Sequence, residues 1–169
     1  MARALNSTNV PSPAEWRAAM GYFPTGVTIV TSWQDKTPVG TTVNAFCSVS
    51  LEPPMLLICL DLENPLRGPI EQCGVFGINI LAEDGHDLAK RFAALPEISR
   101  LADAGFRSVG EGAPQLHASP MFIDCTLECV YPAGDHFVFI GRGVRTERSS
   151  AAPPLLYHKG CFPKLGSAI

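Results

Sequence analysis

The stretch from Gly40 to Pro54 constrains the fold more than any other part of the chain. Its residues alternate with a period of two, which is the period of a β-strand. The alternation predicts one long strand with two unlike faces. The face expected to point into a core is apolar: Val43, Ala45, Cys47, Val49 and Leu51. The opposite face carries polar or aromatic side chains without charge: Thr42, Asn44, Phe46, Ser48 and Ser50.

The uncharged face has two interpretations. Hydroxyls, an amide and an aromatic ring suit a flat organic ligand that forms hydrogen bonds. An antiparallel strand whose polar face meets water has the same pattern, because Ser and Thr are common there. The stretch alone leaves both open.

The other apolar segments predict a mainly β protein of about seven strands with two or three short helices. Strands are expected at 26–33, 55–60, 75–81, 118–131, 137–146 and 155–158, and helices at 11–21, 66–73 and 84–94. The last helix should be capped near Asp84 and turn Leu88, Phe92 and Leu95 inward. So few helices cannot supply the crossovers of a parallel sheet, so an antiparallel barrel with helical insertions is expected.

Composition limits the function classes. The chain has 169 residues, of which 46% are hydrophobic and 17% charged. This length predicts a single domain over residues 11–169, preceded by a flexible tail at 1–10. The low charge predicts buried subunit contacts, most simply in a homodimer. The net charge of −3 gives no support for binding nucleic acid or an anionic membrane.

Cysteine usage and the N-terminus predict a cytoplasmic protein. The six cysteines form no Cys-x-x-Cys pair and no zinc spacing, and most lie in apolar runs, so they are expected to be reduced and buried. The polar N-terminus lacks a secretory signal, and no apolar window is long enough to span a membrane.

The familiar catalytic motifs are missing. The chain has no P-loop, no His-Glu-x-x-His and no Gly-x-Ser-x-Gly, and Gly141-Arg-Gly is not followed by a helix or a third glycine. This gives no support for a metal enzyme or a serine hydrolase. The one compact polar cluster is Gly134-Asp135-His136, expected at a hairpin tip, although a turn of this composition needs no function. Arg91 would either favour a helix C-terminus or hold a phosphate.

Taken together, the motifs resemble the short-chain flavin reductases that supply reduced flavin to two-component monooxygenases. The resemblance runs from about Trp16 to about Leu165. It is carried by six segments in order: FPTGVTIVT from Phe23, GTTVNAFCSVSLEPP from Gly40, FGINIL from Phe76, LAKRFA from Leu88, GDH from Gly134 and PLLYHKG from Pro154.

The resemblance implies a Greek-key split β-barrel that binds flavin, a homodimer with sites near the subunit interface, and hydride transfer from NADH or NADPH to FAD or FMN. Thr41, Thr42, Val43 and Asn44 would lie along the isoalloxazine, largely through their backbone. The remaining implied contacts are Ser48 and Ser50 with the ribityl chain or phosphate, Arg91 and Phe92 with the phosphate end, His136 with the nicotinamide donor, and Thr25 with the donor pocket.

Two departures from the family pattern bear on the flavin tail. Where similar proteins offer Ser and Thr after the strand at 55–60, this chain has Asp61-Leu-Glu-Asn64, so that only Asn64 and backbone amides are expected to meet a phosphate, beside two acidic residues. The C-terminal motif reads Tyr157-His-Lys-Gly-Cys-Phe in place of Tyr-His-Arg-Gly-Arg-Tyr. The choice between FAD and FMN is left open, as is that between NADH and NADPH.

Hydride transfer between two stacked rings needs binding and orientation more than acid–base groups, which agrees with the resemblance. The predicted function is therefore an NAD(P)H:flavin oxidoreductase that releases reduced flavin to a separate monooxygenase by diffusion. Two rivals remain open: a non-enzymatic flavin or haem carrier, and an oxidase with permanently bound flavin. A thiol sensor rests only on the cysteine count.

Overall fold

The computed structural model describes residues 10–94 and 104–166. This part of the chain forms three short helices and eleven strands. The helices are α1 (Pro13–Met20), α2 (Arg67–Cys73) and α3 (His86–Ala93). The strands are β1 (Thr25–Gly26), β2 (Thr28–Gln34), β3 (Thr37–Val43), β4 (Phe46–Leu51), β5 (Pro54–Asp61), β6 (Val75–Ile80), β7 (Phe106–Arg107), β8 (Gln115–Leu116), β9 (Met121–Ala133), β10 (His136–Arg148) and β11 (Leu156–Tyr157).

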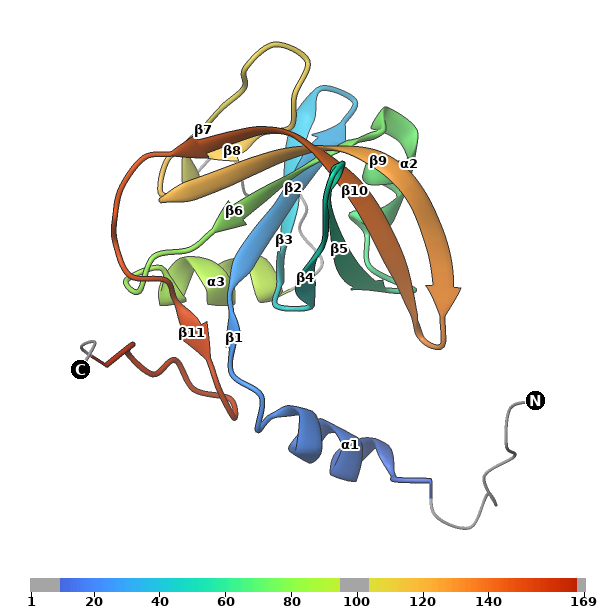
Figure 1. The fold of residues 1–169 in the computed structure, drawn as a ribbon, viewed down its shortest axis with the longest axis vertical. Helices are drawn as coiled ribbons and strands as arrows, with labels where there is room; N and C mark the ends of the chain where they lie inside the picture. The colour runs from blue at the N-terminus through green and yellow to red at the C-terminus, as the bar shows by residue number, and fades with distance from the viewer. Residues whose placement is uncertain (1–9, 95–103, 167–169) are drawn as a thin grey trace.

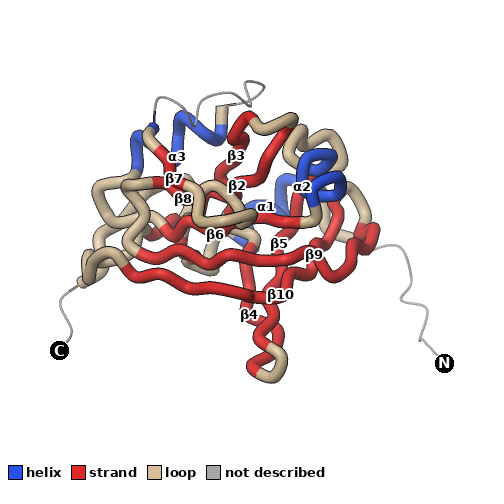
Figure 2. The backbone as a smooth tube through the Cα atoms, turned by 90° about the horizontal axis from the view of Figure 1, so that it is seen from above, coloured by secondary structure: helices blue, strands red, loops and turns tan. Residues whose placement is uncertain are grey.

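Seven strands form one antiparallel sheet in the order β3-β2-β6-β9-β10-β5-β4. The two edge strands, β3 and β4, follow one another in the chain, so the sheet curls until its edges approach (Figure 1). Between them the Cys59 amide of β5 donates to the Ala45 carbonyl at 3.0 Å. Figure 2 shows β6, β9 and β10 side by side, with α2 and α3 on the side away from β10. The predicted antiparallel split barrel is confirmed.

The prediction of one unbroken strand over the Gly40–Pro54 stretch is wrong. The ladder is interrupted at Asn44–Ala45, because the first part pairs with β2 and the second with β5. The predicted faces also fail beyond Val43. Phe46 packs against the core, whereas Cys47, Val49 and Leu51 are exposed. The interruption, and a register shift between Ser48 and Ser50, reset the alternation on which the prediction relied.

The other strand predictions hold, and local chemistry explains several boundaries. Asp35 and Lys36 adopt positive φ angles of 49° and 68°, as the two-residue turn of a β-hairpin requires, so β2 and β3 pair directly. Glu52 and Pro53 form the turn before β5, whose first residue is Pro54. A proline at the first position of a strand interrupts no ladder bond within it.

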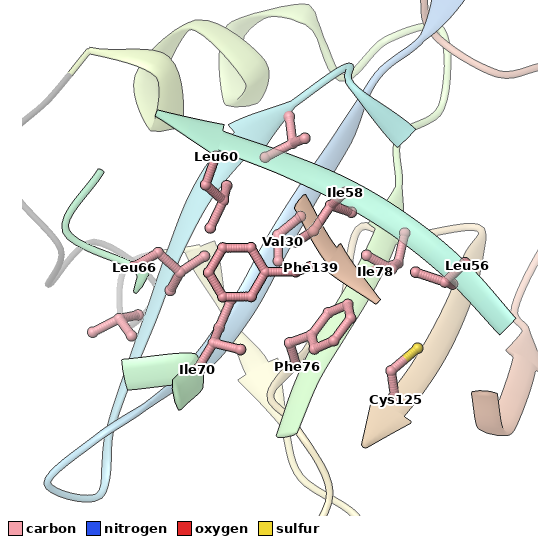
Figure 3. Close-up of a cluster of buried hydrophobic side chains, with 12 residues drawn as sticks. Val30, Leu56, Ile58, Leu60, Leu66, Ile70, Phe76, Ile78, Cys125 and Phe139 are labelled. Atoms are coloured by element: carbon pink, nitrogen blue, oxygen red, sulfur yellow. The ribbon is translucent and has the colours of Figure 1, made fainter. Parts of the chain in front are cut away.

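Two hydrophobic clusters hold the barrel together. The larger fills the barrel interior with side chains from β2, β3, β5, α2, β6, β9 and β10 (Figure 3). Its largest fully buried members are Phe76, Phe139, Ile58, Leu60, Leu66, Ile70 and Ile78. The smaller cluster packs α3 against the barrel through Ile29, Leu81, Ala89, Phe92, Leu116 and Leu155. Through it, α3 is held against Ile29 of β2 and the segments around Leu81, Leu116 and Leu155.

The helices begin and end for identifiable reasons. At α1 the Ser12 hydroxyl accepts from the Glu15 amide while the Glu15 carboxylate accepts from Ser12, a capping box followed by Pro13 at the first turn. α2 ends at Gly74, whose φ of 71° is left-handed. The predicted Asp84 cap of α3 is wrong, because Gly85 precedes the helix and gives no side-chain bond.

Burial of the helices follows the predictions only in part. In α3, Phe92 is buried and Leu88 packs against the smaller cluster, as predicted, while Leu95 lies outside the described residues. By contrast, α1 buries no residue. Figure 1 shows α1 below the barrel, joined to it through β1.

The cysteines are free, but the expectation that they are buried is wrong for three of them: Cys47, Cys73 and Cys161 are exposed. Among the described residues, no helix has the length and apolar character needed to cross a membrane.

Candidate active site

Three segments that are distant in sequence meet at one end of the barrel. They are the β3–β4 link at Asn44–Ala45, the end of β5 with the loop after it, and the tip of the β9–β10 hairpin. Cys59 joins the first two by its bond to Ala45. Asp61 at the end of β5 is the register partner of His136, and the Leu62 amide donates to the Asp135 carbonyl at 3.1 Å. In Figure 1 all three lie at the lower end of the barrel, which we call the barrel end.

Asn44 gives the barrel end a neutral polar group. Its side chain is exposed, and Nδ2 donates to the Thr25 hydroxyl at 3.4 Å. Thr25 lies on β1 and is the register partner of Tyr157 on β11. Two predicted site residues are thus brought together although 19 positions separate them in the chain. Sequence reasoning gave Tyr157 no role; its place beside Thr25 depends on β1–β11 pairing, for which the short segments gave no strong pattern.

Thr41 and Thr42 face the end of α3. The buried Thr41 hydroxyl donates to the Phe92 carbonyl at 3.5 Å, and the half-buried Thr42 hydroxyl donates to the Ala89 carbonyl at 2.7 Å. The Phe92 carbonyl lies in the last turn of α3, where carbonyls lack partners within the helix, so the Thr41 hydroxyl stabilises the C-terminus. The Thr42 hydroxyl ties the middle of the helix to β3. The Val43 carbonyl in turn accepts from the Thr28 hydroxyl at 2.7 Å. These side chains fix α3, and with it Arg91, against β3.

Ser48 and Ser50 lie elsewhere. Together with Phe46 they line a groove of about 380 Å³ between β4 and the far part of β10, where Arg145 and Thr146 form the opposite side. Leu51, which was predicted on the opposite face, lines the same groove, in keeping with the register shift between Ser48 and Ser50. Ser48 pairs with Leu56, whereas the link pairs near Cys59, so roughly 10 Å of strand separates the groove from the barrel end.

Asp61 and Asn64 shape the loop after β5. Asp61 Oδ1 accepts from the Glu63 amide at 2.8 Å, and Asn64 Oδ1 accepts from the Leu66 amide at 3.0 Å. Both are local turns of the kind that Asp and Asn favour. The side-chain oxygens thus support the loop backbone beside the hairpin tip.

The hairpin tip presents His136 at the barrel end. Gly134 has a φ of 67°, which allows the tight turn, and His136 Nδ1 lies 2.8 Å from Asp135 Oδ1. The hydrogen bond from His136 lowers the pKa of the exposed Asp135 carboxyl. The His136 side chain keeps 43% of its surface exposed, so the ring can be reached from solvent.

The barrel end offers the neutral Asn44 amide, backbone groups and the His136 imidazole, together with the carboxylates of Asp61 and Asp135. Among the described residues no group of His, Cys, Asp and Glu side chains is arranged to hold a metal ion. Such surroundings suit an organic ring that is bound by its edge and leaves one face open. A flavin is a ring of this kind, and these residues could hold one.

Comparison with known proteins identifies the family. Residues 20–166 match the model of the flavin reductase like domain. The chain is 36% identical over 150 residues to the reductase subunit HsaB of a flavin-dependent monooxygenase from Rhodococcus jostii, covering 89% of this chain and 76% of that protein. It is 36% identical over 158 residues to an NADH-dependent flavin reductase from a Rhodococcus species, covering 91% and 87%.

A solved structure gives the same result. The NADH:FAD oxidoreductase SgcE6 of Streptomyces globisporus C-1027, in complex with NAD and FAD fragments, superposes with a TM-score of 0.85 at 28% identity, covering 95% of this chain and 98% of that one. The chain therefore belongs to the flavin reductase-like domain family.

Proposed function

We propose that this chain reduces FAD or FMN with NADH or NADPH and releases the reduced flavin, by diffusion, to a separate monooxygenase. The chain is a flavin reductase by family, an enzyme whose substrates are a flavin and a nicotinamide nucleotide. The observation that supports its site is the meeting of Asn44, the loop after Asp61 and His136 at the barrel end.

The residues of the chain bind and orient, while the two ring systems themselves supply the hydride chemistry. In this proposal the backbone of Thr41–Asn44 lies along the flavin ring. The hydroxyls of Thr41 and Thr42 already donate to carbonyls of α3, so their backbone is more available to the flavin ring than their side chains. Backbone N–H groups there would stabilise negative charge on the reduced ring. Thr25 would orient the Asn44 amide and line the donor pocket.

The flavin tail and the nicotinamide take the remaining residues. Arg91 and Phe92 would flank the phosphate end, and Asp61 and Asn64 would border the tail. Ser48 and Ser50 would meet the ribityl chain or phosphate if the tail follows β4 from the link toward their groove. His136 would contact the nicotinamide, with its ring held by Asp135.

The proposed assembly is a homodimer. On the outward face of β4, β5, β10 and β9, register pairing places apolar side chains in two rows: Cys47, Leu57, Ile140 and Cys129, then Cys59, Val138 and Tyr131. Most are half-buried and Tyr131 is 58% exposed, so the face is left partly open within one chain. A second copy of the chain would bury it. Wild type should sediment as a dimer, and Ile140→Glu should shift it to monomer.

The exposed thiols are evidence on the compartment of the cell in which the protein lies. Cys47, Cys73 and Cys161 are free and exposed, and such thiols persist where the surroundings are reducing. This supports the proposal of a cytoplasmic protein.

The test is anaerobic turnover. Dialysed protein mixed with flavin and excess NADH or NADPH should bleach the flavin absorbance, in a four-way comparison of nucleotide and flavin. His136→Ala should raise the KM for the nicotinamide nucleotide while flavin binding is retained. Absence of bleaching with every pair would contradict the proposal, and unchanged kinetics of the His136 variant would remove that residue's role. Protein that stays yellow after dialysis would instead indicate a permanently bound flavin.

A further inference from the structure

The loop that follows Asp61 belongs to the barrel end, yet from Leu62 to Arg67 its backbone has no free donor. The Leu62 amide is bonded to the Asp135 carbonyl. Residue 65 is a proline and has no N–H. The other four amides are bonded within the loop: Glu63 to Asp61 Oδ1 at 2.8 Å, Asn64 to the Asp61 carbonyl at 3.0 Å, Leu66 to Asn64 Oδ1 at 3.0 Å and Arg67 to the Asn64 carbonyl at 3.1 Å.

The consequence is that this loop cannot receive an anion through its backbone without breaking its own turns. Protein sites that bind phosphate through the backbone need several N–H groups pointing at the ligand. From Leu62 to Arg67 each such group already has a partner. The expectation that backbone amides here meet a phosphate is therefore not supported.

The charge of the loop also disfavours the binding of a phosphate. Asp61 and Glu63 are both exposed, and neither forms an ion pair with a described cation. Arg67, the cation at the end of this loop, already has partners. Its Nε lies 2.9 Å from Glu71, and its guanidinium lies 3.8 Å from the centre of the Phe137 ring. A ligand at this loop meets two carboxylates, with Asp135 as a third nearby.

We propose that Asp61 and Glu63 set the flavin specificity by repelling a terminal phosphate, so that the enzyme prefers riboflavin to FAD and FAD to FMN. The inference rests on the proposed function, which brings the flavin tail to the barrel end. A phosphate monoester such as that of FMN carries about 1.5 to 2 negative charges at one point near pH 7. FAD spreads its charge over two phosphates, and riboflavin has none.

The experiment measures kcat and KM for the three flavins under argon with saturating NADH. In wild type the KM for FMN should exceed that for riboflavin by about three- to tenfold, as expected for two exposed like charges. Added salt should reduce this ratio, because it screens exposed charges. In the double variant Asp61→Asn and Glu63→Gln the ratio should fall to within about twofold. An asparagine side chain keeps the Oδ1 acceptor that Asp61 uses, so the turn is preserved.

Glu52→Gln is the matched control, since it removes an exposed carboxylate at the opposite end of β5 and should leave the ratio as in wild type. Equal KM values for the three flavins in wild type would overturn the inference. So would a double variant that changes all three flavins alike. If no flavin were reduced, the proposed function would fail and this specificity with it, a result that differs visibly from both.

Discussion

β3 and β4 come from one alternating stretch of sequence, but their side chains are buried to different extents. In β3, Val39, Thr41 and Val43 are at most 6% exposed, because β2 pairs with the strand and α3 packs on it. In β4, Val49 is 48% and Leu51 86% exposed, and only β5 pairs with the strand. The alternation of a sequence thus predicts that a strand forms, whereas burial depends on which neighbours cover it.

The largest expected effect on stability comes from placing one charge on β3 and, in a second variant, one on β4. Val43→Asp should lower the free energy of unfolding by at least about 3 kcal/mol, because an unpaired carboxylate would be buried. Val49→Asp makes the same change on β4 and should cost less than about 1 kcal/mol. Urea denaturation of both variants measures the difference. Equal losses would mean that the two halves are covered alike.

Two cysteines extend the comparison to the dependence of folding stability on pH. Cys47 is exposed on β4, whereas Cys125 is buried in the larger cluster, where desolvation and then the Asp124 carboxylate raise its pKa from 9.0 to about 12. In the unfolded chain this thiol ionises near 9.0, so stability is intact below that pH and falls as pH rises toward 12.

The measurement is the urea midpoint at about pH 8 and about pH 10. Wild type should lose stability between them, and Cys125→Ala should lose less over the same interval. Alkylation of the native protein should label Cys161, which is exposed and lies outside the proposed dimer face, and spare Cys125. Rapid labelling of Cys125 would contradict its burial.

A smaller effect separates the hydroxyls of the two halves. Thr42→Val removes the bond to the Ala89 carbonyl and should cost about 1 kcal/mol. It should also increase hydrogen exchange in α3. Ser48→Ala, on the exposed strand, should change stability by no more than about 0.5 kcal/mol. If Ser48→Ala proved the more damaging, the assignment of Thr42 as the anchor of α3 would be wrong.

The sequence predicted the elements set by local chemistry, such as the helix within 11–21 and the strands at 26–33 and 55–60. It did not predict the break at Asn44–Ala45, because that break depends on Cys59, which belongs to another strand. Nor could it show that the Thr42 hydroxyl donates a hydrogen bond to the carbonyl of Ala89, 47 residues away. The turns at Asp61 and Asn64 follow from local sequence, because each side-chain oxygen accepts a hydrogen bond from the amide two residues later.

Hydrogen exchange with and without bound FAD tests the central claim most directly, which is that the barrel end holds the flavin. Protection should appear at residues 41–46 and 134–136. A region at the other end of β10, with two pockets that share Ser150, serves as the internal comparison. Asp84 and His117 line one of these pockets and Arg148 lines the other. Protection confined to that region, with none at 41–46 or 134–136, would contradict the account.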